Sequence, residues 1–375
     1  MEIHPKITPI YQTSVFKFED LDGIAQYFDE PGSRYMYSRN GNPNSDELAE
    51  AVNRLEGGQG AIATGSGMAA ILAAILAYCE AGDHVLCAAD IYGGSAALLN
   101  QELNRLGISV SYVPFEKLYD LKLHLQPRTR LLLAETMSNP LLRVVDLRTL
   151  AEECHQHNVK LVIDNTFATP LLTRPIAYGA DITLHSVTKY LAGHSDVTAG
   201  VVVAAEPETA ARLRQIGMTL GLTLSPMESW LAVRGLKTLR LRVREHSANA
   251  LAIAEMLDRH PVVQAVNYPG LPSHAEHQLA IAQGGTQFGG MLSFRLPDDE
   301  KQVNQFMRRT QRFPFAPSLA GVDSSLSHPL STSHRALTLE QQQRLGITVG
   351  LVRLSVGIEL KEELLIDLEQ ALGQA

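Results

Sequence analysis

The segment Thr64-Gly-Ser-Gly-Met68 joins a short apolar run to a stretch of small residues that is typical of a helix. The first N–H groups of a helix and the positive end of its dipole bind anions, and glycine lets the backbone approach a phosphate closely. We therefore expect that this segment can bind an anion such as a phosphate. The alternative is a helix start that packs closely and binds nothing.

The same segment also fits a second template. Gly65, Gly67 and Ala70 have the spacing G-x-G-x-x-A, and Asp90 follows about 20 residues later, after another apolar run. This pattern is typical of dinucleotide binding, in which the glycines approach a pyrophosphate and the acidic residue binds a ribose. An NAD-type oxidoreductase therefore remains an alternative function from another class of enzyme.

Asp164 follows the apolar run 161–163. A carboxylate at the end of a buried strand lies at the edge of the sheet where ligands bind. There it could pair with the nitrogen of a cationic heterocycle and keep that nitrogen protonated. A helix cap or a loop hydrogen bond is the alternative role for this residue.

The segment Ser186-Val-Thr188-Lys189 follows the apolar run 182–184. Residues two apart in an extended segment point the same way, so Ser186 and Thr188 present two hydroxyl groups to one place. Two hydroxyls suit a phosphate, and an adjacent lysine suits an imine to an aldehyde. The alternative is that Lys189 is an ordinary surface lysine. This interpretation is less favoured because Gly67, Asp164 and this segment all follow expected strands.

Short apolar runs separated by helical stretches predict an α/β fold with a mostly parallel sheet covered by helices on both faces. The expected strands of this sheet are 61–63, 85–88, 109–113, 131–134, 161–163, 182–184 and 200–204. In such sheets ligands bind beyond the carboxyl ends of the strands, which is where the candidate residues fall.

The chain divides into three regions. Residues 1–44 lack clear periodicity and are expected to form an extended arm and a loop, and a helix is expected over 45–55. Residues 45–225 are assigned to the domain that carries the candidate site.

The remaining residues, 226–375, are expected to form a smaller α/β domain with strands near 291–295 and 352–356. Ser225-Pro-Met-Glu228 has the pattern of a capping box and predicts a long helix that continues to about Arg244.

Composition excludes several classes of protein. Hydrophobic residues make up 45% of the 375 positions, enough for a large core, and the net charge of −8 argues against a nucleic-acid-binding surface. The apolar run 68–79 is shorter than the about 20 residues that span a membrane, and residues 1–10 contain no signal core. Three cysteines without C-x-x-C spacing indicate buried thiols and a cytoplasmic protein.

The segment Ser186-Val-Thr-Lys-Tyr-Leu-Ala-Gly-His-Ser-Asp196 resembles the attachment motif for pyridoxal 5′-phosphate (PLP) in the enzymes of cysteine and methionine metabolism. That family includes cystathionine γ-synthase, the cystathionine β- and γ-lyases and methionine γ-lyase. The resemblance covers almost the whole chain. The other matching segments occur in the order of the family: Tyr37-Ser-Arg39-Asn-Gly-Asn-Pro43, Ser66–Met68, Tyr92-Gly93, Asn139-Pro140, Asp164, Ser318-Leu319 and Arg353-Leu-Ser-Val-Gly-Ile-Glu359.

The resemblance implies the PLP fold-type I and a set of roles. Lys189 would attach the cofactor and move protons, Asp164 would keep the pyridine nitrogen protonated, and Tyr92 would stack on the ring. The phosphate would be held by Gly67, Met68, Ser186 and Thr188. Tyr37 and Arg39 would reach the phosphate of a neighbouring subunit, so the site would need a homodimer, with dimers paired into a tetramer. With Lys189 and Tyr92, Tyr37 is implied to be catalytic, and no metal is implied.

The substrate is implied to be a small amino acid whose α-carboxylate binds Arg353, with help from Asn139 and Ser318. Alternatively, Arg353 is a partner in a buried ion pair, Asn139 forms a turn before Pro140, and Ser318 is an ordinary loop residue. No membrane or nucleic acid is implied as a partner.

Three departures from the family concern the substrate. Gly94 stands where methionine γ-lyases commonly have cysteine, Leu319 where some β-lyases have tryptophan, and Asp323 where the γ-enzymes often have glutamate. We therefore expect elimination or replacement at Cγ, as in cystathionine γ-synthase and γ-lyase, with Asp323 binding the distal ammonium of cystathionine. Methionine γ-lyase and cystathionine β-lyase are the alternatives. A non-catalytic protein with this fold is disfavoured because Lys189, Asp164 and Arg353 are all present.

Overall fold

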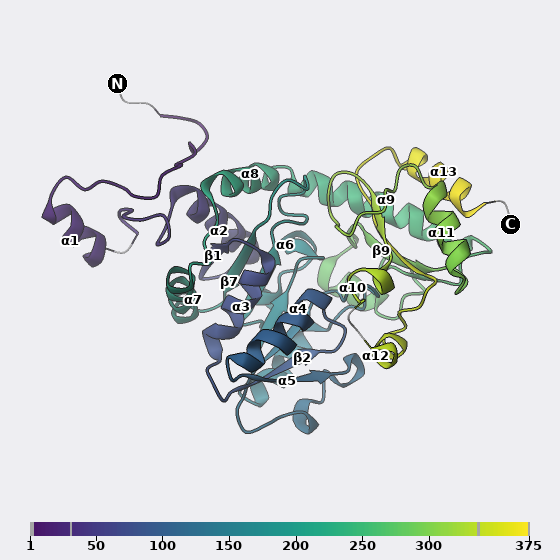
Figure 1. Ribbon diagram of the computed structural model, residues 1–375, viewed down its shortest axis with the longest axis horizontal. Coiled ribbons are helices and arrows are strands. Elements are labelled where there is room, and N and C mark those ends of the chain that lie inside the picture. Colours follow the sequence, from purple (N-terminus) through teal and green to yellow (C-terminus); the bar gives the residue numbers. More distant parts are fainter. Residues whose placement is uncertain (1–3, 31, 336–337, 374–375) are drawn as a thin grey trace.

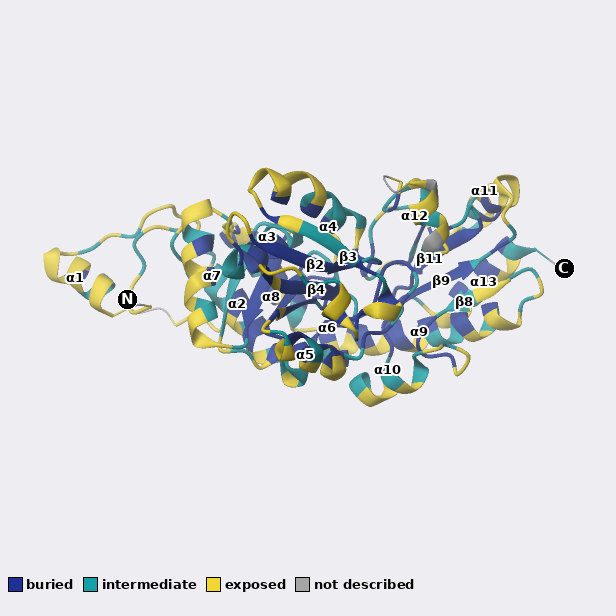
Figure 2. Cartoon of the chain, turned by 90° about the horizontal axis from the view of Figure 1, so that it is seen from below, coloured by how far each residue is buried: buried dark blue, intermediate teal, exposed yellow. Residues whose placement is uncertain are grey.

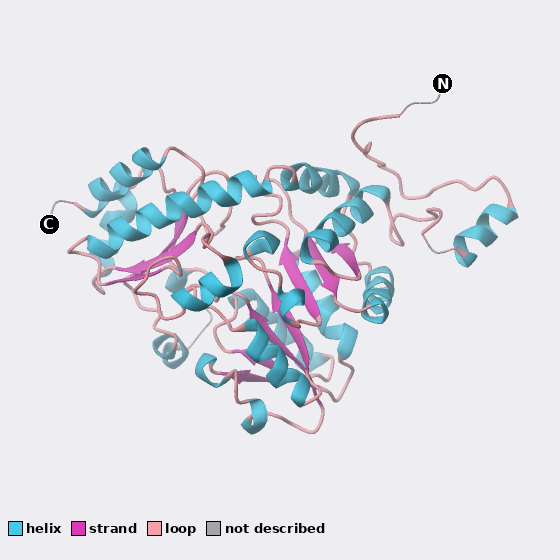
Figure 3. Cartoon of the chain, turned by 180° about the vertical axis from the view of Figure 1, so that it is seen from behind, coloured by secondary structure: helices cyan, strands magenta, loops and turns pink. Residues whose placement is uncertain are grey.

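A computed structural model describes residues 4–30, 32–335 and 338–373 of the chain. The strands form two separate sheets with helices around each, and an N-terminal arm reaches away from the body (Figures 1 and 3). No helix in the described ranges is both long and apolar enough to cross a membrane.

The larger sheet has seven strands in the order β1-β7-β6-β5-β4-β2-β3 in the described part of the chain. Their bounds are β1 Gly60–Thr64, β2 His84–Ala88, β3 Ser109–Val113, β4 Thr129–Glu135, β5 Lys160–Asp164, β6 Ile182–Ser186 and β7 Gly200–Ala204. Strand β7 is antiparallel to both of its neighbours, β1 and β6, and the remaining pairs are parallel. The fold class predicted from the sequence is confirmed, and each expected strand of this sheet is present.

Both faces of this sheet are buried by helices, which explains the continuous apolar runs of its strands. On one face, residues such as Val162 and Leu133 pack against α3 (Gly67–Tyr78) and α7 (Pro207–Leu220). On the other face, alternate residues such as Leu132 and Ile163 pack against α5 (Leu147–Gln156), and Val201 and Val203 lie in the same cluster as α2 residues (Pro43–Glu56). The three cysteines are buried and free, as predicted.

The smaller sheet is antiparallel, with the order β10-β11-β9-β8. Its strands are β8 Ala265–Asn267, β9 Met291–Arg295, β10 Ser325–Ser327 and β11 Leu351–Ser355. Helices α9 (Leu239–Arg259), α11 (Glu300–Arg309) and α13 (Lys361–Leu372) lie beside it (Figure 1). The strands of both sheets are largely buried, whereas α1 (Leu21–Asp29) is mostly exposed (Figure 2). The domain division at residue 225 stays a prediction.

The remaining elements are helices and helical turns. The helices are α4 Gly93–Ala97, α6 Thr169–Leu172, α8 Pro226–Leu236, α10 His277–Gly284 and α12 Leu339–Arg344, with a π-helical turn at Leu98–Leu103. The 3₁₀ turns are Phe115–Lys117, Leu121–Leu123, Pro175–Tyr178 and Pro329–Ser331.

Two expectations were wrong. The arm contains a helix, α1 (Leu21–Asp29), which begins because the Asp20 side chain accepts the Gly23 N–H. The long helix expected to reach Arg244 is divided into α8 and α9. In a continuous α-helix the Gly235 carbonyl would accept the N–H of residue 239, but here it accepts the Thr238 N–H at 3.1 Å, the Thr238 Oγ1 at 3.1 Å and the Arg242 Nη2 at 2.9 Å. These bonds compete with helix propagation at that point.

Candidate active site

A cavity of about 570 Å³ lies where the carboxyl ends of β5 and β6 meet loops and strand β11 of the smaller sheet. Its walls come from widely separated parts of the chain. The residues that line it are Ser66, Gly67, Met68, Ile71, Tyr92, Glu135, Met137, Asn139, Asp164, Thr166, Phe167, Ser186, Thr188, Lys189, Thr198, Pro317, Leu319, Thr332, Ser333 and Arg353. The structure therefore brings most of the residues singled out in the sequence to one place.

Lys189 follows β6 in a tight turn, with its N–H donating to the Ser186 carbonyl at 3.1 Å. Its side chain lines the cavity. Burial lowers the pKa of the Lys189 amine, and the positive charge of Arg353 lowers it further. A lowered pKa increases the fraction of neutral amine, which is the form that attacks an aldehyde.

Asp164 is the last residue of β5, and its Oδ1 accepts hydrogen bonds from both the N–H and the hydroxyl group of Thr166. Burial raises the pKa of Asp164, whereas the two Thr166 hydrogen bonds lower it. A cationic heterocycle in the cavity would favour the ionised form of this carboxylate. The geometry is therefore suited to pairing with a protonated ring nitrogen.

The start of α3 lies directly against Ser186. A Cβ atom added to Gly67 would be 2.8 Å from Ser186 Cβ, so a side chain at position 67 would displace this wall of the cavity. The Ser66 side chain caps the helix by accepting the Ala69 N–H at 3.1 Å. The close approach leaves the first helical amides beside a hydroxyl, which suits a phosphate.

Thr188 lines the cavity together with Ser186, as expected. Its hydroxyl, however, already bonds to the backbone of Ala199, accepting from the N–H at 3.0 Å and donating to the carbonyl at 3.2 Å. The neighbouring Thr198 also lines the cavity, although no pattern in the sequence singled it out.

Tyr92 immediately precedes α4, and its ring is 42% exposed on the wall of the cavity. Gly94 lies against this ring, because an added Cβ would be 2.4 Å from Tyr92 Cε1. Because glycine has no Cβ, the Tyr92 ring can pack directly against the backbone of Gly94. A larger residue would force the ring or the backbone to shift.

Arg353 enters the cavity from β11 and is 5% exposed. Its Nη1 donates to Asn139 Oδ1 at 2.9 Å and its Nη2 to the Ser318 carbonyl at 3.4 Å, while its buried Nε has no partner among the described residues. Burial lowers the pKa of the guanidinium to about 10. A buried cation held by neutral oxygens is suited to binding a carboxylate.

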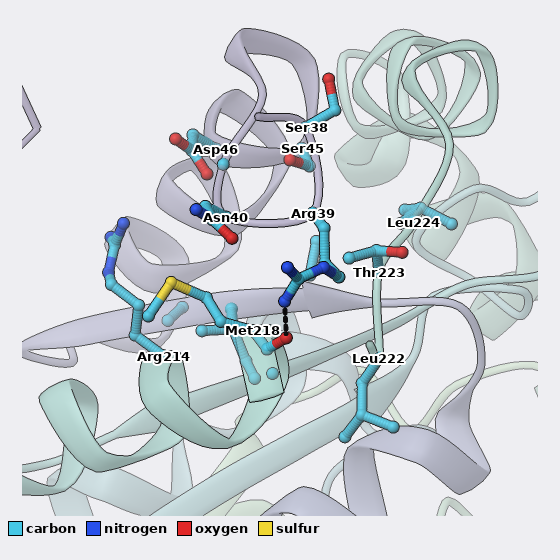
Figure 4. A pocket seen from close by; sticks show the side chains of 15 residues that line it. Ser38, Arg39, Asn40, Ser45, Asp46, Arg214, Met218, Leu222, Thr223 and Leu224 are labelled. Atoms are coloured by element: carbon cyan, nitrogen blue, oxygen red, sulfur yellow. Dashed lines mark hydrogen bonds between the residues drawn. The ribbon is translucent and has the colours of Figure 1, made fainter. Parts of the chain in front are cut away.

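Several candidate residues do not line this cavity. Ser318 contributes its carbonyl oxygen to Arg353, and Asp323 has an exposed side chain outside the lining residues. Tyr37 and Arg39 lie at the base of the arm, where the Arg39 Nη1 donates to the Met218 carbonyl at 2.7 Å across a hollow of about 50 Å³ (Figure 4). Their roles stay predictions.

The sequence interpretation overlooked Glu135, Thr166 and Ser333, which also line the cavity. Glu135 follows the expected strand 131–134, so the signal that identified Asp164 could also have identified Glu135. Ser333 had no comparable signal, because its place depends on a loop of the smaller sheet folding over Gly93.

The topology excludes the dinucleotide-binding alternative. That fold requires the first two strands to be parallel and linked through one βαβ unit, with neighbouring places in the sheet. Here β1 pairs with β7, and β7, β6, β5 and β4 separate it from β2. The G-x-G-x-x-A spacing here belongs to a helix start in a sheet that lacks the dinucleotide-binding strand order. The NAD-type interpretation was therefore wrong.

Comparison with known proteins supports the same conclusion as the site. The family model described as "Cys/Met metabolism PLP-dependent enzyme" matches residues 2–373. The chain belongs to this family. Members of the family use PLP, so the cofactor predicted from the sequence is confirmed, and so is the prediction of an enzyme.

Relatives with different activities are similar to this chain to nearly the same degree. A cystathionine beta-lyase of Lactococcus lactis subsp. cremoris is 44% identical over 364 residues, covering 97% of this chain and 93% of the relative. A cystathionine gamma-lyase of Bacillus subtilis is 42% identical over 364 residues, with the same coverage. The crystal structure of a cystathionine gamma synthase from Xanthomonas oryzae pv. oryzae, in complex with aminoacrylate and cysteine, has a TM-score of 0.90 and 42% identity, covering 98% of this chain and 92% of that one.

Proposed function

We propose that Lys189 attaches PLP and that the enzyme catalyses elimination or replacement at Cγ, or at Cβ, of sulfur-containing or O-acylated amino acids. The observation that carries the proposal is the convergence of Lys189, Asp164 and Arg353 on one cavity in a member of this family. Bound PLP supplies an electron sink for the negative charge that develops at the substrate Cα.

The lining residues fit both ends of this cofactor. The close contact between Gly67 and Ser186 leaves backbone amides and a hydroxyl group for a phosphate, together with Met68 and Thr188. Asp164 supplies a buried carboxylate for a cationic ring nitrogen, and Tyr92 supplies an aromatic face.

Lys189 is the proposed acid and base. Its buried amine, with a lowered pKa, removes the proton from the substrate Cα, and for γ-chemistry it also moves a proton at Cβ. Arg353 holds the substrate α-carboxylate while Asn139 and the Ser318 carbonyl orient the guanidinium. Holding the carboxylate fixes the position of Cα relative to the lysine.

We propose γ-elimination or γ-replacement as the main activity and β-elimination as a slower side reaction. Gly94 and Leu319 support this choice, since neither fills the cavity as cysteine or tryptophan would. Asp323 is proposed to bind the distal ammonium of cystathionine, from an exposed position outside the lining residues.

We also propose a homodimer with shared sites, paired into a tetramer, in the cytoplasm. Apolar side chains on the arm support a covering partner: Leu21 is 81% exposed, Phe28 65% and Val15 57%. In such a dimer Tyr37 and Arg39 would serve the phosphate of the neighbouring subunit.

Product analysis tests the reaction. The purified holoenzyme is incubated separately with cystathionine, methionine, cysteine and an O-acylated homoserine plus cysteine. The proposal predicts cysteine and 2-oxobutyrate from cystathionine, or cystathionine from the activated homoserine. Pyruvate and homocysteine as the dominant products of cystathionine would instead establish the β-lyase alternative, and no turnover of any amino acid would refute the proposed function.

A further inference from the structure

Three neighbouring strands of the larger sheet carry acidic residues at or just beyond their carboxyl ends. Asp164 ends β5, Glu135 ends β4, and Asp90 lies just beyond the end of β2, in the sheet order β5-β4-β2. Glu135 and Asp164 are in register, and both line the cavity. The proposed reaction uses Asp164 and leaves Glu135 without a role.

Glu135 lies near two loops that bring candidate residues to the cavity. Its Oε1 accepts the backbone N–H of Tyr92 at 2.7 Å, and the backbone of Asn139 lies close enough to lower the pKa of the carboxyl. Tyr92 is the N-cap residue of α4, and its side chain makes no capping hydrogen bond. Glu135 instead supplies an acceptor for a backbone N–H at the start of this helix. The residue expected to stack on the cofactor is thus bonded to Glu135, and the residue that orients Arg353 lines the same cavity.

Burial and two acidic neighbours both act on the pKa of Glu135. Burial raises its pKa well above the usual range, and the charges of Asp164 and Asp90 raise it further. Asp164 has two hydrogen bonds from Thr166 that favour its ionised form. Two adjacent buried carboxyls do not both ionise readily, and burial together with the neighbouring charges favours the neutral form of Glu135.

We propose that Glu135 is a positioning residue whose side chain holds the Tyr92 loop beside the Asn139 loop through its acceptor oxygen. This inference rests on the proposed function, because it assigns Tyr92 and Asn139 their places around PLP and the substrate. The role requires the reach and the oxygen of a glutamic acid and does not require its negative charge.

Two substitutions separate reach from charge. Glu135→Gln keeps the chain length and the acceptor oxygen and removes the charge, whereas Glu135→Asp keeps the ionisable carboxyl and shortens the reach. Equilibrium dialysis of the apo-enzymes against PLP gives the dissociation constants. We expect Glu135→Gln to stay within about threefold of wild type. Glu135→Asp should bind PLP at least fivefold more weakly than Glu135→Gln, because a buried N–H left without its acceptor costs roughly five- to hundredfold.

The same two substitutions at Glu255, an exposed residue of α9 outside the cavity, serve as matched controls. Thermal unfolding of each apo-enzyme separates loss of folding from loss of binding. If Glu135→Asp binds PLP less than fivefold more weakly than Glu135→Gln, or if the order is reversed, the positioning role is wrong. Wild-type enzyme that binds no PLP would refute the proposed function itself and, with it, this inference.

Discussion

The Arg353 guanidinium and the Asn139 side chain are joined by a hydrogen bond of 2.9 Å, although 214 positions separate them along the chain. This bond connects β11 of the smaller sheet to the loop that follows β4 of the larger sheet. It orients the guanidinium towards the cavity and leaves the buried Nε without a partner among the described residues. A substrate carboxylate is the ligand that such an arrangement accommodates.

Arg353→Lys tests this assignment. A guanidinium binds a carboxylate through two parallel hydrogen bonds that an ammonium does not reproduce. We expect kcat/KM for every amino-acid substrate to fall about 10- to 100-fold, mainly through KM. The visible spectrum of the bound cofactor should stay unchanged. An unchanged KM would place the carboxylate elsewhere.

The pKa of Lys189 predicts how its removal affects the apo-enzyme. The lowered pKa means that the folded state binds the proton less tightly than the unfolded state. Wild-type stability therefore rises with pH between the folded-state pKa and the ordinary value near 10.5. Lys189→Met should unfold at a higher temperature than wild type near pH 7, and this difference should shrink towards pH 10. A difference that grows with pH would contradict the lowered pKa.

The strands of the larger sheet were predictable because their burial on both faces produces continuous apolar runs. The run 200–204 coincides with β7, and 161–163 lies within β5. The direction of β7 was not predictable, because a strand buried on both faces has the same composition in parallel and antiparallel pairs. The break between α8 and α9 coincides with side-chain hydrogen bonds from Thr238 and Arg242 to the Gly235 carbonyl, which hydrophobic periodicity does not report.

Part of the cavity was predictable for a similar reason. Asp164 and Lys189 follow strands whose ends meet at one edge of a sheet, so their proximity follows from the fold class. The contributions of Pro317, Thr332 and Ser333 depend on how the smaller sheet lies against the larger one. The family motif pointed to Arg353, but its contact with Asn139 required the tertiary structure.

Mixed oligomers test the proposed sharing of sites. Arg39→Ala and Lys189→Ala homo-oligomers should each be nearly inactive if Arg39 serves the phosphate of the neighbouring subunit. A dimer with one subunit of each kind has both substitutions in one site and neither in the other. Co-refolded mixtures should therefore recover part of the activity, up to about a quarter of wild type for random pairing. Confirmed mixing without any recovery would indicate sites built within one chain.

Asp323→Ala tests the proposed preference for cystathionine. Loss of a carboxylate that binds the distal ammonium should raise KM for cystathionine about 3- to 10-fold and leave KM for methionine nearly unchanged. Glu116→Ala, which removes an exposed carboxylate outside the cavity, is a matched control. Equal effects on cystathionine and methionine would exclude a role for Asp323 in recognition.

The most direct test of the account is to locate the lysine that carries PLP. The holoenzyme is reduced with borohydride, digested and mapped by mass spectrometry. The account predicts the pyridoxyl group on Lys189, whose buried amine faces the cavity, and its loss in Lys189→Ala. Lys160, which bonds to Asp181, is an internal comparison outside the cavity. A pyridoxyl group on Lys160 or any lysine other than Lys189 would contradict the account.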